Sequence, residues 1–187
     1  MDFNNAKELF TKQEMFEFAS KNLSIEGLIC EFGCQKGNSI NCFAKNLPNK
    51  TIHGFDSFEG LPEKWFGPYR KGIFKVNHKK VHFEENVKLH VGLFSDTIPV
   101  FKKENEGLLS FVHVDCDLYS STKDVFNGLK DRFVKGTLIL FDEYHNYPTW
   151  EEHEYKAFME FIEETGFAFE YLAYKDSEYG QALVVLK

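Results

Sequence analysis

The chain has 187 residues and a formal net charge of −7, and 43% of its residues are hydrophobic, which supports one packed domain and excludes a disordered chain. The acidic balance argues against nucleic acid as a partner, because a phosphate backbone would be repelled. No apolar run is long enough to span a bilayer and the N-terminus lacks the pattern of a signal peptide, so we expect a cytoplasmic protein with no membrane partner.

Apolar residues recur with helical and strand-like periods in turn along the chain. In the N-terminal segment 1–26, an apolar stripe predicts a helix over 6–23. Strand-sized runs then alternate with helix-forming segments, and two final runs, 167–174 and 180–187, have the spacing of a β-hairpin. The alternating strands are expected at 27–32, 50–56, 87–92, 109–115 and 136–142, and the helices at 37–47, 95–104, 120–133 and 150–166.

This order predicts an α/β fold in a single domain, residues 1–187: a Rossmann-like, doubly wound sheet, mostly parallel, with an antiparallel C-terminal hairpin. The segment 57–86 is different, because it combines Gly and Pro breaks with aromatic and basic residues and shows no period. So long an irregular insert in a compact domain is more often functional than idle. We therefore expect it beside a binding site.

Polar residues interrupt the apolar runs where the predicted strands end. In a doubly wound sheet, ligands bind beyond the carboxyl ends of the strands. We therefore expect these residues to gather at one edge of the sheet and to form a site. They are Glu31–Gly33, Asp56, Gly92, Asp115 and Asp142–Glu143.

The first of these strand ends leads into a glycine turn, CEFGCQKGNS, at residues 30–39. The turn lacks the Gly-Lys-Ser/Thr of a P-loop and one glycine of the dinucleotide fingerprint. Glu31 would repel a pyrophosphate but suits a cationic ligand, and Asp56 lies where an acidic residue accepts both ribose hydroxyls. S-adenosylmethionine, which joins an adenosine to a sulfonium and an amino acid, fits these features. The alternative is that the glycines only form a tight turn.

Five blocks of the sequence resemble one known family. They read EFGCQKGNS, GFDSFEGLPEKW, VGLFSDTIP, HVDCDLYSST and LFDEYHNYPTWEEHEYKAF, in this order, and the resemblance covers roughly residues 27–187. The family is that of the class I S-adenosylmethionine-dependent methyltransferases, in the macrocin O-methyltransferase-like group. The resemblance implies a seven-stranded sheet whose last strand runs antiparallel, which agrees with the predicted hairpin.

The resemblance also implies a cofactor site. The glycine turn would hold the methionine end of S-adenosylmethionine, Asp56 would hold the ribose, and the segment after the third strand would face the adenine. By motif, the cofactor-binding residues would be Glu31, Gly33, Gly37, Asn38, Ser39, Asp56, Ser57, Phe58, Phe94, Ser95, Asp96 and Asp115.

A magnesium site is the second implication. The better-known members are sugar O-methyltransferases of natural-product pathways that use magnesium, and their metal ligands match Asp115, Asp142 and Glu143, the last of which is often Asp there. Independently, three carboxylates at one sheet edge repel one another unless a cation lies between them, and hard oxygen ligands select Mg²⁺ or Ca²⁺. The alternative is that Asp142 and Glu143 only cap the following loop or bond to the cofactor.

Methyl transfer to a hydroxyl also needs a group that draws off the proton. We expect Asp115 and Asp142 to act there, and we place His145, in the loop after the fifth strand, as a candidate general base near neutral pH. His113 shares the face of its strand with Asp115 and is another candidate, although a lone histidine is more often structural. Asp117 is expected to orient its own turn.

The predicted function is transfer of a methyl group from S-adenosylmethionine to a hydroxyl of a small-molecule acceptor, expected to be a sugar or a sugar-containing metabolite, with help from Mg²⁺. The aromatic residues of the insert 57–86 would suit the wall of an acceptor pocket. Two alternatives stay open: a metal-independent N-methyltransferase, and a non-catalytic S-adenosylmethionine-binding partner protein. The sequence identifies neither the acceptor nor whether the chain forms a homo-oligomer.

Overall fold

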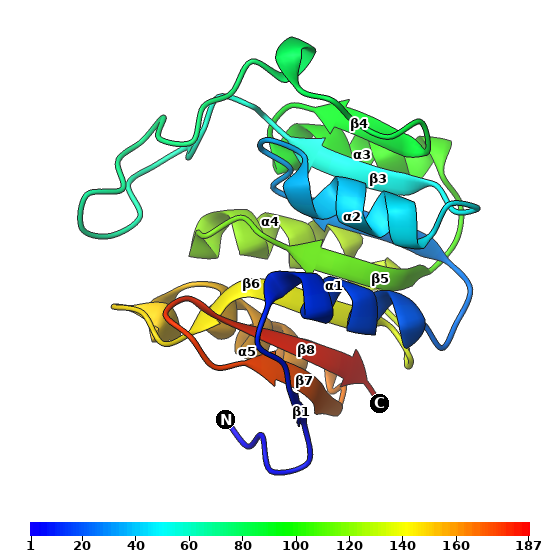
Figure 1. The fold of residues 1–187 in the computed structure, drawn as a ribbon, viewed down its shortest axis with the longest axis vertical. Coiled ribbons are helices and arrows are strands. Elements are labelled where there is room, and N and C mark those ends of the chain that lie inside the picture. The colour runs from blue at the N-terminus through cyan, green and yellow to red at the C-terminus, as the bar shows by residue number, and fades with distance from the viewer.

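The computed structural model describes all 187 residues, which form one mixed sheet with helices on both faces (Figure 1). None of the helices has the length and hydropathy that a bilayer span needs. The strands are β1 Lys7–Glu8, β2 Leu28–Phe32, β3 Ile52–Asp56, β4 Val87–Val91, β5 Leu109–Val114, β6 Leu138–His145, β7 Phe169–Lys175 and β8 Gly180–Leu186. The α-helices are α1 Lys12–Lys21, α2 Asn38–Asn46, α3 Phe94–Glu104, α4 Tyr119–Leu129 and α5 Glu154–Thr165, and the 3₁₀ turns are His78–Lys80, Lys130–Arg132 and Trp150–Glu152.

The sheet confirms the predicted architecture. Its strand order is β1-β7-β8-β6-β5-β2-β3-β4, the five strands from β2 to β6 pair in parallel, and β8 runs antiparallel to both β6 and β7. Helices α1 and α2 pack on one face, and α3, α4 and α5 on the other, so two apolar cores enclose the sheet. The sheet has one strand more than the seven expected, because β1 pairs in parallel with the edge strand β7.

The N-terminal helix is shorter than the sequence predicts. It begins at Lys12 instead of residue 6, because Thr11 and Glu14 form a capping box: the Thr11 hydroxyl accepts the Glu14 N–H at 3.1 Å, and the Glu14 carboxylate accepts the Thr11 N–H at 2.9 Å. The residues before the cap are extended and supply β1. Phe10, which the helical pattern assigned to the apolar stripe, is therefore 74% exposed.

Strand β6 is longer than expected at its carboxyl end. The sequence pattern ended it at residue 142, where the carboxylates begin, but the strand continues to His145 and all eight of its residues are buried. Its pairing with β8 resumes at His145 and Gly180 after an irregularity that follows Phe141. The acidic pair Asp142–Glu143 thus lies inside a buried strand and not in a loop.

The insert 57–86 projects beyond the carboxyl ends of the parallel strands (Figure 1). Two of its segments are joined by backbone bonds, from Leu61 N–H to the Ile73 carbonyl at 3.0 Å and from Gly72 N–H to the Leu61 carbonyl at 2.9 Å. Its aromatic residues form a small separate core around Trp65 with Tyr147 from the loop after β6. The insert is therefore anchored above the sheet edge where ligands of this architecture bind.

Candidate active site

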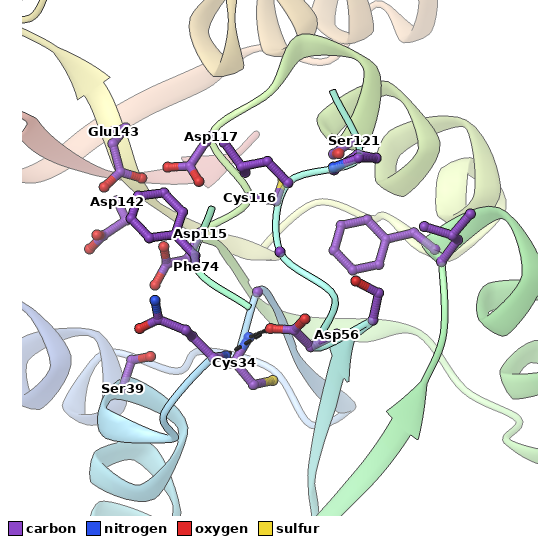
Figure 2. A pocket seen from close by; sticks show the side chains of 18 of the residues that line it. Cys34, Ser39, Asp56, Phe74, Asp115, Cys116, Asp117, Ser121, Asp142 and Glu143 are labelled. Atoms are coloured by element: carbon purple, nitrogen blue, oxygen red, sulfur yellow. Dashed lines mark hydrogen bonds between the residues drawn. The ribbon is translucent and has the colours of Figure 1, made fainter. Parts of the chain in front are cut away.

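A cavity of about 520 Å³ opens beyond the carboxyl ends of β2, β3, β5 and β6 (Figure 2). On one side it is lined by the glycine turn, Asp56 and the start of α3. On the other side it is lined by four carboxylates, those of Asp115, Asp117, Asp142 and Glu143, and the insert contributes Gly60–Glu63 and Phe74. One cavity therefore has two sides: one formed by the glycine turn and Asp56, and an acidic side formed by the four carboxylates.

The glycine turn depends on Gly33. Its φ is +99°, and a Cβ at this position would lie 1.7 Å from the carbonyl oxygen of Asp115. The same approach of the two chains is fixed by the bond from the Asp115 N–H to the Phe32 carbonyl, 2.9 Å long. Only glycine fits here, because any side chain would separate the ends of β2 and β5.

Asp56 ties the glycine turn to the end of β3. Its Oδ2 accepts the backbone N–H groups of Cys34 and Gln35 at 2.9 and 2.7 Å, and its Oδ1 accepts that of Phe58 at 2.6 Å (Figure 2). A carboxylate offers about four lone-pair sites, so one remains for a ligand hydroxyl. The residue thus shapes the turn and still faces the cavity.

Glu31 lies beneath the cavity and does not line it. The side chain is 1% exposed, its Oε1 accepts the Ser39 hydroxyl at 2.8 Å, and its Oε2 lies 3.0 Å from Nδ1 of His113. Ser39 itself lines the cavity. Any influence of Glu31 on a ligand is therefore transmitted through Ser39.

Burial dominates the chemistry of the acidic side. It raises the pKa of Asp115 and Glu143 well above the usual carboxyl range, and the charge of Asp142 adds to this effect. Burial and the Asp142 charge also raise the pKa of Asp117 to about 7. Glu154, the first residue of α5, accepts the N–H groups of Asp117 and Glu143 at 3.2 and 3.4 Å and so fixes the backbone of this cluster.

Asp142 is the exception among these carboxylates. Burial alone would raise its pKa, but His113 and Lys12 outweigh burial and hold the pKa well below its usual range. Lys12 Nζ forms an ion pair with Oδ2, Gln181 Nε2 donates to Oδ1, and Nε2 of His113 lies 3.9 Å from Oδ1, too far for a hydrogen bond. We therefore attribute the effect of His113 to its charge.

His113 is buried between two carboxylates. Burial lowers its pKa, but Asp142 and Glu31 more than compensate and raise the pKa to about 10. The two carboxylates therefore favour the protonated ring, whose positive charge would balance part of the charge of the acidic side. This position on the inner side of the cluster suits a counter-ion better than a general base.

At the acidic side, two residues that line the cavity and one buried behind them form a group that a metal ion could use. Ligand atoms of His113, Asp115 and Asp142 lie within 4.8 Å of one another. Glu143, which the sequence placed in the metal set instead of His113, is outside this group, but it lines the cavity and its buried Oε2 has no hydrogen-bond partner. The oxygen atoms of this edge are hard ligands of the kind that Mg²⁺ binds.

Comparison of the sequence with known proteins identifies its family. The sequence profile of the family described as "Methyltransferase domain" matches residues 30–144, more than half of the chain. The chain belongs to this methyltransferase family. A curated relative of this methyltransferase is demethyldecarbamoylnovobiocin O-methyltransferase of Streptomyces niveus, 25% identical over 166 residues, which cover 75% of this chain and 62% of the relative. The chain thus spans less than two thirds of that relative's length.

Solved structures confirm the class I methyltransferase fold. The calicheamicin methyltransferase CalS11 superposes with a TM-score of 0.77 at 24% identity, over 92% of this methyltransferase and 77% of that chain. The O-methyltransferase NovP superposes with a TM-score of 0.73 at 19% identity, over 93% and 78% of the two chains. The methyltransferase family and the class I fold inferred from the sequence are therefore both correct.

Most site residues named from the methyltransferase sequence meet at the cavity. Those that line it are Gly33, Asn38, Ser39, Asp56, Ser57, Phe94, Ser95, Asp115, Asp142 and Glu143. Four further candidates for the cofactor site do not line the cavity: Glu31, Gly37 and Phe58 are buried, and Asp96 is exposed. Gly37 has a φ of +76° and precedes α2, and Phe58 contributes its backbone N–H to Asp56.

The structure does not bring His145 to the cavity. The residue is 3% exposed, and its ring is packed so closely on Gly180 of β8 that a Cβ there would lie 2.3 Å from it. Phe3 covers it from the N-terminus, with ring centroids 5.4 Å apart. The sequence pattern misplaced His145 because it ended β6 three residues too early. We assign it no part in the transfer.

Three residues of the site were not named from the sequence, Lys12, Glu154 and Gln181, and a fourth, Asp117, was expected only to orient its turn. Asp117 had a visible signal, since it follows Asp115 at a spacing of two just beyond a buried strand. The other three act on the acidic side from α1, α5 and β8. Nothing local in their sequence marks them, because their roles arise only when these elements pack together.

Proposed function

We propose that this methyltransferase transfers the methyl group of S-adenosylmethionine to a hydroxyl group of a sugar or of a sugar-containing small molecule. The observation that carries the proposal is the single cavity that joins the Asp56 and glycine-turn side to the acidic side. The names of the relatives support the acceptor class: one is a methyltransferase of a rhamnosyl-tetracenomycin from Streptomyces olivaceus, 28% identical over 107 residues, and CalS11 is described as a TDP-rhamnose 3'-O-methyltransferase.

The first side fits S-adenosylmethionine. Gly33 allows the turn to lie close against the end of β5, Asp56 retains an acceptor position for a ribose hydroxyl, and the nearby carboxylates suit a positively charged ligand. We expect Asn38 and Ser39 to hold the amino-acid end and Phe94 and Ser95 to face the base. When bound, the cofactor supplies an electrophilic methyl group on a sulfonium.

On the acidic side, Asp117 is the proposed general base. Its carboxyl group lines the cavity, and its backbone is held in place by Glu154 and by a left-handed conformation with a φ of +62°. Aspartate adopts this left-handed conformation more readily than most residues, so the turn places its carboxyl group at the cavity at little cost. Asp117 would accept the proton of the acceptor hydroxyl, while Asp115, on the adjoining strand end, would orient that hydroxyl.

The acidic side also fits a divalent cation such as Mg²⁺. Asp115, Asp142 and Glu143 would hold it, since they present hard oxygen ligands and Glu143 Oε2 has no other partner. When bound, the ion lowers the pKa of an acceptor hydroxyl and fixes its orientation. We include magnesium in the proposal on this chemistry.

Phe74 of the insert is the proposed acceptor wall. Its side chain lines the cavity on the acidic side (Figure 2), it is 37% exposed, and its φ is +71°, an unusual value for a bulky residue. The flat face of an aromatic ring suits the C–H face of a sugar. The backbone pairing of the insert around Leu61 and Ile73 holds Phe74 at this place.

A labelled-methyl transfer screen tests the proposal. Purified protein is incubated with S-adenosylmethionine and Mg²⁺ and with nucleotide sugars, rhamnosides and other glycosides, and the products are identified by mass spectrometry. We expect methylation of a sugar hydroxyl, and binding of S-adenosylhomocysteine in calorimetry. A protein that binds S-adenosylhomocysteine but methylates only amines would refute the acceptor class, and one that binds no cofactor would refute the whole proposal.

A further inference from the structure

Both oxygens of Asp142 have protein partners within the fold. Oδ2 is paired with the ammonium of Lys12, and Oδ1 accepts from Gln181. The Asp142 side chain is 3% exposed, whereas that of Lys12 is 50% exposed. One partner of the ion pair is thus fixed inside β6, and the other reaches in from the edge of the cavity.

Lys12 reaches this place because of how α1 begins. It is the first residue of the helix, directly after the capping box of Thr11 and Glu14, and α1 is anchored by Met15, Phe16 and Ala19 in the core. The helix therefore holds the Lys12 backbone beside the cavity, while the end of its long side chain is free to move into water.

Lys12 is also the main mobile positive charge of the acidic side. Of the residues that line the cavity, only Lys12 and Lys36 are basic, and Lys36 belongs to the glycine turn and forms no ion pair. The other positive group near the cluster, His113, is completely buried and lies between Glu31 and Asp142. A cation that enters the cluster therefore meets the Lys12 ammonium at Asp142.

We propose that Lys12 is a tethered counter-cation that competes with a divalent metal ion for Asp142. The inference rests on the metal site included in the proposed function. A doubly charged ion bound by Asp115, Asp142 and Glu143 would lie next to the ammonium on the same carboxylate, and the two like charges repel each other strongly where water is excluded. Lys12 is the partner that leaves, because its side chain is exposed and Asp142 stays fixed by Gln181.

Lys12 is therefore a positioning residue with two effects. Without a metal ion, its ammonium pairs with Asp142 and supplies a positive charge at the acidic side. With a metal ion present, the ion binds only as far as it displaces the ammonium, so Lys12 weakens the affinity for the metal. Removal of its charge should produce opposite changes in these two properties.

The test compares metal affinity and thermal stability in matched variants of the full chain. Lys12→Met removes the charge and keeps the length of the side chain, Lys12→Arg keeps the charge, and Lys21→Met removes a charge from the other end of α1, where Lys21 pairs only with Glu17. Each protein is treated with EDTA, dialysed and titrated with Mn²⁺ and Mg²⁺ by calorimetry. We expect Lys12→Met to bind either ion roughly tenfold more tightly than the wild type, and the other two variants to remain within about twofold.

Thermal unfolding supplies the second readout, which does not depend on activity. In EDTA, Lys12→Met should melt several degrees below the wild type, since Asp142 is left without its counter-cation, and saturating Mn²⁺ should remove this difference. Lys12→Gln replaces Lys12→Met in both measurements if the latter does not fold. Each sample is also titrated with S-adenosylhomocysteine.

Equal metal affinities in wild type and Lys12→Met would overturn the competition, as would the absence of metal binding in both. In either case, binding of S-adenosylhomocysteine shows that the cofactor part of the proposed function survives. If the metal affinities differ as expected but S-adenosylhomocysteine does not bind, the proposed function fails while the role of Lys12 stands.

Discussion

The two sides of the cavity are built in different ways. The cofactor side consists of a glycine turn and the carboxylate of Asp56, whose three hydrogen bonds all come from backbone N–H groups. The acidic side consists of titratable side chains from β5, β6 and the turn after β5, supported by Lys12 of α1, Glu154 of α5 and Gln181 of β8. The cofactor side is formed by the ends of two neighbouring strands, whereas the acidic side depends on side chains from elements throughout the fold.

This difference sets what a substitution does on each side. On the cofactor side, the groups that shape the site also hold the chain together, so a change there should lower stability and ligand affinity at the same time. On the acidic side, the buried carboxylates repel one another and add little to stability, so a change to a carboxylate outside the Lys12–Asp142 ion pair should affect turnover first. The two sides are therefore separable by measuring folding, cofactor binding and turnover in the same variants.

The largest effect is expected for Asp117→Asn on the acidic side. The substitution keeps the size of the side chain but removes the proposed base, and turnover on an accepted substrate should fall by about 10²- to 10⁴-fold. S-adenosylhomocysteine affinity should stay within about twofold of the wild type. Asp124→Asn, which removes one charge from the same cavity at α4, is the control and should retain most of the turnover. Full activity in Asp117→Asn would remove this residue from the mechanism.

Gly33→Ala should show the opposite profile on the cofactor side. The added methyl group meets the Asp115 carbonyl and a φ of +99°, so we expect a loss of about 3–5 kcal/mol in the free energy of unfolding and no measurable cofactor binding. Gly166→Ala is the control, because Gly166 also has a positive φ, +73°, but open space around it. It should cost only about 1 kcal/mol. Urea unfolding of the two variants measures the difference, and equal losses would show that the close approach is unimportant.

Asp56→Ala should combine a folding effect and a binding effect. Three backbone N–H groups lose their acceptor, which should lower stability by about 2–3 kcal/mol, and the affinity for S-adenosylhomocysteine should fall by at least about tenfold. Asp176→Ala, in the exposed turn between β7 and β8, is the control and should change neither quantity by much. If the Asp56→Ala protein is as stable as the wild type and binds S-adenosylhomocysteine normally, Asp56 neither holds the glycine turn nor binds the cofactor.

The same contrast explains how much the sequence predicted. The alternation of strands and helices, the terminal hairpin, Gly33 and Asp56 were all correctly placed, because period and spacing reflect backbone geometry within one βα unit and its neighbour. The parallel pairing of β5 with β6 also brought Asp115 and Asp142 together, as the strand ends indicated.

One error is local and the others come from contacts between distant elements. The capping box at Thr11 displaced the start of the first helix, and β1 formed only because β7 offers an edge. His145 was placed in a loop because carboxylates usually end a buried strand, whereas here Asp142 is stabilised in the strand by Lys12 and Gln181. Lys12 and Gln181 lie 130 and 39 positions from Asp142 in the sequence, so this compensation leaves no periodic signal.

The smallest expected effect is a pH dependence of stability that arises from two histidines outside both sides of the cavity. Beneath the cofactor side, Nδ1 of His53 on β3 lies 3.1 Å from Nε2 of His90 on β4, and Phe101 of α3 packs on both rings. Burial, with smaller contributions from His90 and Lys88, lowers the pKa of His53 to about 4. Burial and Lys88 also lower the pKa of His90, while Glu104 of α3 opposes this.

His53 therefore has a pKa of about 4 in the folded protein and its ordinary value of 6.5 in the unfolded chain. Because the unfolded state then holds more protons, the contribution of His53 is fully present above about pH 6.5 and is lost as the pH falls toward 4. Allowing for the solvent that reaches the pair, we expect about 1–2 kcal/mol less stability at pH 5 than at pH 7.5 from this group. His53→Phe should remove this part of the pH dependence in urea unfolding, whereas His82→Gln, at an exposed histidine, should not. The acidic side titrates equally in all three proteins, so it cancels in the comparison, and parallel curves for wild type and His53→Phe would assign the whole pH dependence to the carboxylates.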